Sequence, residues 1–376
     1  MNAISRFELF HSDDRCQIDQ ASLVGLPTIV DRSGIVEVPS DYLRHLAMSG
    51  TPSSTLDTYA KILREFWARL YEKRKCWTRV DDAFLRRWRN ELRNKKRLKD
   101  ATINQKLRTT FGLYVWAEES GRISNVVDLS GRKFSQLPIS TNSTGPNTYS
   151  CPLVFKTTEE PNRHTPTDEE VENLHVVLSG RHAVRDGLIM AWAEQTGLRR
   201  AEILSLRTQQ IPAAPDIQNL YDREEVHSVL VRLKGGRQCA VSVMPSLLDQ
   251  TRDYIEFERS DTLERARSRL SGLRDRGALF LSETGAAPKP NSVSRQMARF
   301  FKRAGIRNAS LHRLRAVHLT RLAERYVDVV DEHGRHLSIE TIVLLIKDAA
   351  RWAGTGSLHR YVEIARSRRA HQAKPA

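Results

Sequence analysis

Residues 310–315 read Ser-Leu-His-Arg-Leu-Arg and open a stretch of helical periodicity that leads towards Tyr361. His312 and Arg315 are three positions apart, so on a helix they share one face. Trp352 lies nine positions before Tyr361. A lone tyrosine near the end of a chain is ordinarily a packing residue, and its surroundings decide whether it has another role.

A second basic motif lies more than a hundred residues earlier. Residues 196–202 read Thr-Gly-Leu-Arg-Arg-Ala-Glu, which gives Arg199 and Glu202 the same three-residue spacing. Between the two motifs, Lys234 precedes a Gly-Gly pair that joins two β-rich runs, as in a tight hairpin. Two arginines, a lysine, a histidine and a late tyrosine can hold and polarise a phosphodiester while a phenol attacks it.

The order of these residues resembles that of the tyrosine recombinases of the phage integrase type. The similarity extends over about residues 165–361, and a weaker one to the preceding DNA-clamping domain covers about residues 52–122. It implies a mainly α fold with a small β-hairpin or sheet. A helical, SAM-like core-binding domain would precede a mixed α/β catalytic domain. The residues that carry the resemblance are Arg199, Glu202, Lys234, His312, Arg315, Trp352 and Tyr361.

The resemblance also implies a role for each of these side chains. Arg199 and Arg315 would bind the non-bridging oxygens of the phosphate, because arginine is always charged and binds bidentately. Tyr361 would be the nucleophile and form a 3′-phosphotyrosine. Lys234 would protonate the leaving 5′-oxygen, and His312 would act as acid or base near neutrality.

Two further residues have supporting roles in this interpretation. Glu202 would orient its neighbours. Trp352 stands where many members of the family have histidine, and its indole N–H would bind the phosphate. Such chemistry needs no metal and no cofactor. The four cysteines are scattered without zinc-ligand spacing, and there is no glycine-rich phosphate loop.

The charge of the chain indicates its partner. Lys and Arg number 60 and Asp and Glu number 45, a net charge of +15 over 376 residues. A polyanion such as nucleic acid is the simplest partner, although a merely soluble basic protein could carry the same charge. The resemblance to the tyrosine recombinases implies double-stranded DNA. No run approaches the roughly 20 apolar residues of a membrane span, so no membrane partner is expected. The first residues lack a signal-peptide pattern, which predicts a cytoplasmic, nucleoid-associated protein.

Composition and periodicity divide the chain into five parts. The role of the first part stays open between contact with DNA, contact with a neighbouring subunit and packing on the next domain. The last part, short and basic, could dock on a neighbouring subunit, contact DNA or be disordered. The parts are 1–50 (N-terminal segment), 51–125 (helical core DNA-binding domain), 126–164 (Ser/Thr/Asn/Pro-rich linker), 165–361 (catalytic domain) and 362–376 (basic tail).

Local patterns predict the individual elements. A short strand is expected at 34–39, and two strands at 228–233 and 238–243. A long helix over 245–272, with alternating charges, is expected to be exposed support. A short helix after Gly197 is expected to carry Arg199 and Glu202 near its N-terminus. The other helices are expected at about 41–48, 56–70, 80–92, 100–121, 167–178, 183–195, 291–303, 311–325, 338–352 and 357–364.

Two basic runs are candidates for DNA contact. The first lies between the second and third helices of the core-binding domain. Alone it could be a solvated loop, but ahead of a phosphodiester site it is expected to grip backbone phosphates. The second forms one face of the helix at 291–303. The residues are Lys95, Lys96, Arg97 and Lys99 in the first run, and Arg295, Arg299 and Lys302 in the second.

The expected function is that of a site-specific DNA recombinase, which integrates, excises or transposes DNA. It would act as a homo-tetramer on paired DNA sites and be a dimer or monomer in isolation. A type IB-like topoisomerase and a catalytically inactive DNA-binding relative remain as alternatives. Tyr326 is the only nearby rival to Tyr361 as nucleophile.

Overall fold

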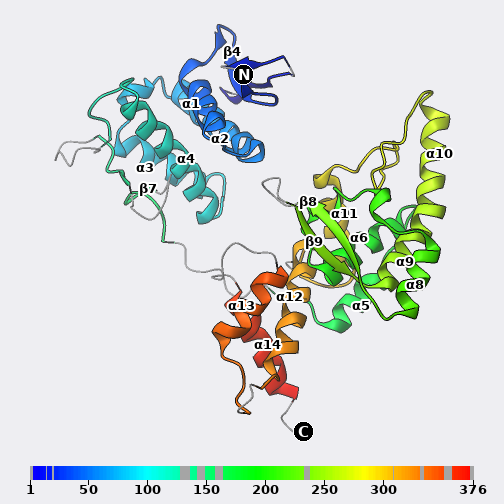
Figure 1. Ribbon diagram of the computed structural model, residues 1–376. Helices are drawn as coiled ribbons and strands as arrows, with labels where there is room; N and C mark the ends of the chain where they lie inside the picture. The colour runs from blue at the N-terminus through cyan, green and yellow to red at the C-terminus, as the bar shows by residue number, and fades with distance from the viewer. Residues whose placement is uncertain are drawn as a thin grey trace. The chain divides into compact units, whose positions relative to one another are not determined.

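The computed structural model describes residues 3–13, 15–18, 21–127, 136–141, 149–156, 164–232, 238–307, 309–330, 334–350 and 358–372. The chain divides into two compact units, Met1–Glu160 and Pro161–Ala376, and each is described by itself (Figure 1). The prediction of a mainly helical chain with small antiparallel sheets is confirmed. Among the described residues, no helix combines the length and apolar composition that a membrane crossing requires.

The N-terminal segment folds onto the helices that follow it. Its main sheet is antiparallel in the order β1-β4-β5. Ile29 and Leu43 are fully buried in one cluster with Leu63, so the packing role left open for this segment is the one observed. The expected strand at 34–39 ends early, because the next helix already begins at Glu37. The elements are β1 (Glu8–His11), β2 (Gln17–Ile18), β3 (Ala21–Ser22), β4 (Pro27–Asp31), β5 (Gly34–Ile35) and α1 (Glu37–Met48), after a 3₁₀ turn at Ala3–Arg6.

Three helices form the centre of the first unit: α2 (Ser53–Glu72), α3 (Asp82–Asn94) and α4 (Asp100–Glu119). Phe66 is fully buried and touches aromatic rings from both other helices. Its ring centroid lies 5.0 Å from that of Trp88 and 6.3 Å from that of Tyr114. Phe66, Trp88 and Tyr114 are therefore core residues, as predicted, rather than platforms for stacking DNA bases.

Part of the expected linker belongs to the first unit. Cys151 and Leu153 are buried in its core. The side chain of Asn104 binds both backbone groups of Phe155, each at 2.9 Å. Two short strands, β6 (Ser140–Thr141) and β7 (Tyr149–Ser150), pair in the same region. The linker predicted at 126–164 is thus too long, because composition alone does not reveal that these residues pack on α3 and α4.

The second unit combines helices with one β-hairpin (Figure 1). Strands β8 (His227–Arg232) and β9 (Gln238–Val243) are antiparallel, with Arg232 opposite Gln238. The helices are α5 (Asp168–Val176), α6 (Ala183–Thr196), α7 (Arg200–Ile203), α8 (Ala214–Asp222), α9 (Pro245–Tyr254), α10 (Ser260–Arg269), α11 (Pro290–Arg303), α12 (Leu311–Val327), α13 (Ile339–Ala350) and α14 (His359–Gln372).

The helix expected over 245–272 differs from the prediction in two ways. A π-helical turn at Ile255–Arg259 separates α9 from α10. Helix α9 is part of the core, since Thr251 is fully buried and its hydroxyl oxygen accepts the indole N–H of Trp192 at 3.1 Å. Burial raises the pKa of Tyr254 to about 12. The prediction of an exposed support helix is wrong for α9, because its alternating charges hid a buried apolar face.

The C-terminal helices α12, α13 and α14 pack together around a third apolar cluster (Figure 1, orange to red). Helix α14 continues to Gln372, beyond the end expected near 364. Val362 and Ala365 are fully buried in the cluster. Arg368 donates to Glu324 at 3.2 Å and to the carbonyl of Pro166 at 3.2 Å. The described part of the expected basic tail, as far as Gln372, is therefore a packed helix within the second unit.

Candidate active site

Arg199 lies at the start of the four-residue helix α7, where Glu202 holds it. The Glu202 carboxylate accepts the backbone N–H of Arg199 at 2.7 Å and its Nη1–H at 2.9 Å. Glu202 is buried, whereas the Arg199 side chain is 39% exposed. The buried carboxylate thus orients the arginine and leaves its guanidinium accessible to a ligand.

Arg315, on α12, contacts the backbone just before α7. Its Nη1 donates to the carbonyl oxygen of Gly197, two residues before Arg199. A second contact lies one turn further, where His318 Nδ1 is 3.2 Å from the carbonyl oxygen of Glu194. Arg315 is only 1% exposed. The motif residues of α7 and α12 therefore lie together, although more than a hundred residues separate them.

Gly197 makes this close approach of α6 and α12 sterically feasible. It ends α6 in the left-handed conformation, with φ of 64°. A Cβ atom there would lie 2.6 Å from Cδ2 of His318. A side chain at this position would meet both backbone strain and a clash, which explains a glycine between the apolar helix and Arg199.

We expect Gly197→Ala to destabilise the protein by roughly 1–3 kcal/mol more than Gly272→Ala. Gly272 is the matched control, because it also has a positive φ of 84° but a Cβ atom added there would meet nothing within 4 Å. Urea denaturation followed by circular dichroism measures both losses. Equal losses would mean that α12 does not pack against Gly197 as described.

His312 lies in the first turn of α12 and reaches the surface. Its pKa is below the ordinary histidine value, with burial as the largest cause and the charge of Arg315 as the next. Smaller contributions come from Arg313, Arg199 and Arg360. Four guanidinium groups thus act on one imidazole, and this corner of the second unit is strongly electropositive.

Tyr361 lies in the first turn of α14 and is 3% exposed. It packs in the same apolar cluster as Ala316 and Leu319, which follow Arg315 on α12. Tyr326 belongs to the far end of α12, eleven residues or about 16 Å along the helix from Arg315.

Two of the seven motif residues fall outside the described residues. Lys234 belongs to the connection between β8 and β9, and only the flanking strands are described. Trp352 follows α13 and is likewise not described. The structure gives the relative placement of Arg199, Glu202, His312, Arg315 and Tyr361 through helices α7, α12 and α14.

The candidate DNA-contacting residues are all exposed. In the first unit, Lys96 forms an ion pair with Glu65 at 2.5 Å, so one charge of this run has an internal partner. In the second unit, the basic face of α11 lies opposite a buried face. The exposed residues are Lys95, Lys96, Arg97 and Lys99 between α3 and α4, and Arg295, Arg299 and Lys302 on α11.

Two arginines near the site were not singled out from the sequence. Arg313 lies inside the His312-x-x-Arg315 motif and is buried, with its Nε–H donating to the carbonyl of His164 at 2.7 Å. It anchors the segment before α5 to α12. Arg360 precedes Tyr361, and its guanidinium carbon is 4.9 Å from the centre of the tyrosine ring. The only sequence signal for either was its place beside a motif residue.

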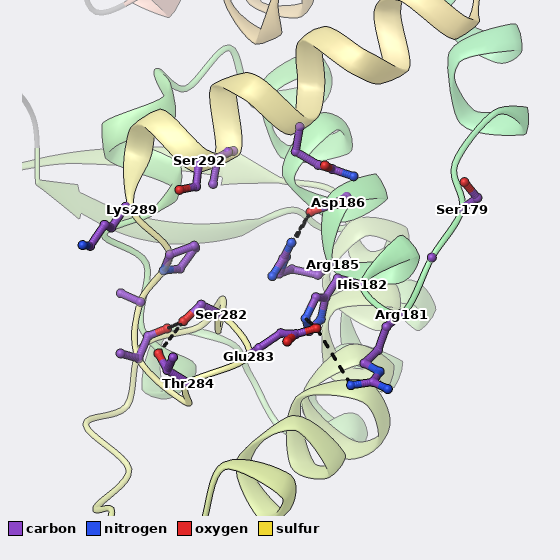
Figure 2. A pocket seen from close by; sticks show the side chains of 16 residues that line it. Ser179, Arg181, His182, Arg185, Asp186, Ser282, Glu283, Thr284, Lys289 and Ser292 are labelled. Carbon is purple, nitrogen blue, oxygen red and sulfur yellow. Dashed lines mark hydrogen bonds and ion pairs between the residues drawn. The ribbon is translucent and has the colours of Figure 1, made fainter. Parts of the chain in front are cut away.

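A separate hollow of about 580 Å³ lies at the start of α6 and α11 (Figure 2). Arg185 spans its wall, bound to Asp186 at 2.7 Å and to the carbonyl of Leu281 at 2.8 Å. Burial raises the pKa of Asp186, with the charge of Arg185 acting in the opposite direction. None of the five described motif residues lines this hollow, and Arg185 holds the loop at Leu281 against α6.

Comparison with known families gives two consecutive matches. Residues 165–348 match the phage integrase family, and residues 40–121 match the phage integrase N-terminal SAM-like domain. Transposase A from transposon Tn554 of Staphylococcus aureus is 30% identical over 170 residues, which is 44% of this chain and 44% of that protein. The matched region thus spans less than half the length of this relative.

Solved structures show the same fold at low sequence identity. The XerH site-specific recombinase bound to its palindromic difH substrate has a TM-score of 0.57 at 17% identity, covering 86% of this chain and 80% of that chain. A lambda integrase dimer bound to a COC′ core site has a TM-score of 0.53 at 14% identity, covering 86% and 94%. The Tn1549 transposon integrase with transposon right end DNA has a TM-score of 0.52 at 15% identity, covering 90% and 99%.

The two matched domains are successive parts of one kind of enzyme, and together they cover most of the chain. A SAM-like helical domain followed by an integrase catalytic domain defines the class. The chain belongs to the phage integrase family, the tyrosine recombinases.

Proposed function

We propose that this protein is a site-specific DNA recombinase that cuts and rejoins strands through a 3′-phosphotyrosine. The observation that carries the proposal is the electropositive corner at His312, formed by Arg199 and Arg315 beside the helix of Tyr361. Two guanidinium groups suit phosphoryl transfer, because the pentacoordinate transition state has more negative charge on its equatorial oxygens than the ground state. The relationship to a transposase supports mobile-element transposition as the biological setting.

The reaction is an exchange of one phosphate ester for another. The Oη–P bond to Tyr361 forms while the bond from phosphorus to the 5′-oxygen breaks. In our proposal His312 accepts the phenol proton, and Lys234 supplies a proton to the leaving oxygen. Trp352 adds an indole N–H to the phosphate. Because the ester is conserved, attack by a 5′-hydroxyl on the phosphotyrosine reverses the step without an external energy source.

The partner in this proposal is double-stranded DNA, held by both units. The exposed cations between α3 and α4 and on α11 would neutralise backbone phosphates, which predicts a steep fall of affinity with salt. The working assembly would be a homo-tetramer on two paired sites, in a cytoplasmic, nucleoid-associated location. The solved relatives with DNA support a DNA partner.

Covalent trapping tests the function even when the target sequence is unknown. Purified protein is incubated with fragmented DNA of its own replicon, denatured, and recovered with any DNA that remains attached. Sequencing the attached 3′ ends should identify one recurrent site. A plasmid with two such sites then distinguishes recombination from relaxation. Relaxation of a plasmid with one site, with no exchange between two, would favour the topoisomerase alternative.

The low pKa of His312 predicts the pH dependence of cleavage. A histidine base works when neutral, and its pKa below the ordinary value keeps it neutral at and above about pH 6.5. We expect protonation of His312 to slow single-turnover cleavage only below that pH. In His312→Gln this acid limb should disappear along with most of the rate. A wild-type rate that rises as the pH falls would instead assign His312 as an acid.

Folding must be checked over the same pH range. The unfolded chain binds the His312 proton more tightly than the folded one, so the stability contributed by this group declines as pH falls through the region below about 6.5. Circular dichroism at each pH separates this loss from a change in chemistry.

A further inference from the structure

Arg360 directly precedes the proposed nucleophile on α14. Neighbouring residues on a helix point about 100° apart and do not normally face each other. Here the guanidinium carbon of Arg360 nevertheless lies 4.9 Å from the centroid of the Tyr361 ring. The arginine side chain therefore folds back over its neighbour, in the range of a cation–π contact.

In this position the arginine leaves one hydrogen-bond donor unsatisfied. Within the part of the chain that the structure describes, its Nε is buried and has no hydrogen-bond partner. A buried donor without an acceptor disfavours the folded state, because its hydrogen bond to water is lost and not replaced. The face of the Tyr361 ring supplies an electrostatic attraction that partly offsets this loss.

The charge of Arg360 also acts on His312. It is one of the groups that lower the pKa of His312, together with Arg199 and Arg315. Arg313, the remaining one, is occupied by the carbonyl of His164 and the hydroxyl of Thr165, at 2.7 Å and 3.3 Å. Arg360 thus acts on the imidazole of His312 and also contacts the ring of Tyr361.

A hollow of about 530 Å³ adjoins this side chain. It is lined by Arg360 together with Thr167, Glu363 and Ser367. An uncharged side chain of similar length fits there without overpacking the core, so the charge can be removed while the fold is kept.

We propose that Arg360 is a positioning residue that prepares Tyr361 for attack. Its charge over the ring stabilises the negative charge that develops on the phenol oxygen as the Oη–P bond forms and the proton leaves. It also holds the ring in one orientation. This inference rests on the proposed function, in which Tyr361 is the nucleophile.

The test compares Arg360→Gln, Arg360→Lys and Arg369→Gln in the full chain. Arg369 is the matched control, since it lies on the same helix, is half exposed and pairs with Asp328. A suicide duplex with a nick beside the trapped site gives the single-turnover rate of covalent attachment at saturating protein. Fluorescence anisotropy gives DNA affinity, and both are measured across a pH series.

We expect Arg360→Gln to slow attachment roughly 10- to 100-fold near neutral pH, with DNA affinity within about 3-fold of wild type. The deficit should shrink as the pH rises, because the phenol then loses its proton more readily. Arg360→Lys should recover most of the rate, and Arg369→Gln should match wild type.

Three results would overturn the inference. One is an Arg360→Gln rate equal to wild type. Another is a deficit that is the same at every pH and is not rescued by lysine, which would give Arg360 a purely structural role. The third is absence of any adduct with wild-type protein, which removes the proposed function itself and is recognised before the variants are compared.

Discussion

Tyr361→Phe should abolish covalent attachment to DNA while leaving DNA binding unchanged. The phenol oxygen is the proposed nucleophile, and phenylalanine has no atom that can replace it. We expect a loss of at least about 10⁴-fold in adduct formation, to below detection. The ring itself packs among Ala316, Leu319 and Val362, and phenylalanine keeps that packing. Denaturing gels of the suicide-substrate reaction report the adduct, and fluorescence anisotropy reports binding.

The matched control for this variant is Tyr326→Phe. Tyr326 packs at the edge of the same apolar cluster, on α12, and loses the same single atom. Its variant should form the adduct at the wild-type rate. An adduct that survives Tyr361→Phe and vanishes with Tyr326→Phe would move the nucleophile to the other tyrosine. Loss of DNA binding with Tyr361→Phe would show that the hydroxyl is structural.

Arg199→Ala should cost about 3–4 kcal/mol of transition-state stabilisation, or about 10²- to 10³-fold in the rate of attachment. The guanidinium would contact phosphate oxygens whose negative charge grows in the transition state, so the loss should fall on the rate more than on affinity. Arg199→Lys should recover only part of the rate, because an ammonium cannot form two parallel hydrogen bonds.

Arg265→Ala controls for the removal of a surface arginine. Arg265 is 37% exposed and pairs with Asp261 on its own helix, much as Arg199 is 39% exposed and pairs with Glu202. Loss of such an exposed pair costs under about 1 kcal/mol of stability, and we expect no change in cleavage. In Arg199→Ala the buried Glu202 carboxylate loses its hydrogen bond from the arginine side chain and keeps the one from the backbone N–H of residue 199. Urea denaturation of both variants therefore shows whether a slower cleavage reflects lost stability. Near-wild-type cleavage by Arg199→Ala would contradict its assigned role.

Local sequence was sufficient to predict most of the helices. The start of α5 is an example, since Thr167 accepts the N–H of Glu170 at 3.2 Å and Glu170 accepts the N–H of Thr167 at 2.9 Å. Such a capping box depends only on residues three positions apart. Long-range packing was less accessible. Cys151 and Leu153 pack on helices some fifty residues earlier, and α9 buries a face that its charged residues concealed.

The amino-acid sequence alone determined which reactive groups the chain carries, their order, and the excess of positive charge that suits a polyanionic partner. These depend on residue identity and short spacing. Tertiary structure decided how the groups are used: Arg315 is buried on the carbonyl of Gly197, Arg313 anchors residue 164, and Arg360 covers the ring of Tyr361. The first two contacts join segments more than a hundred residues apart, and the third depends on how a long side chain folds back within its packed surroundings. These contacts depend on how α6, α12 and α14 pack, which residue identity and short spacing do not reveal.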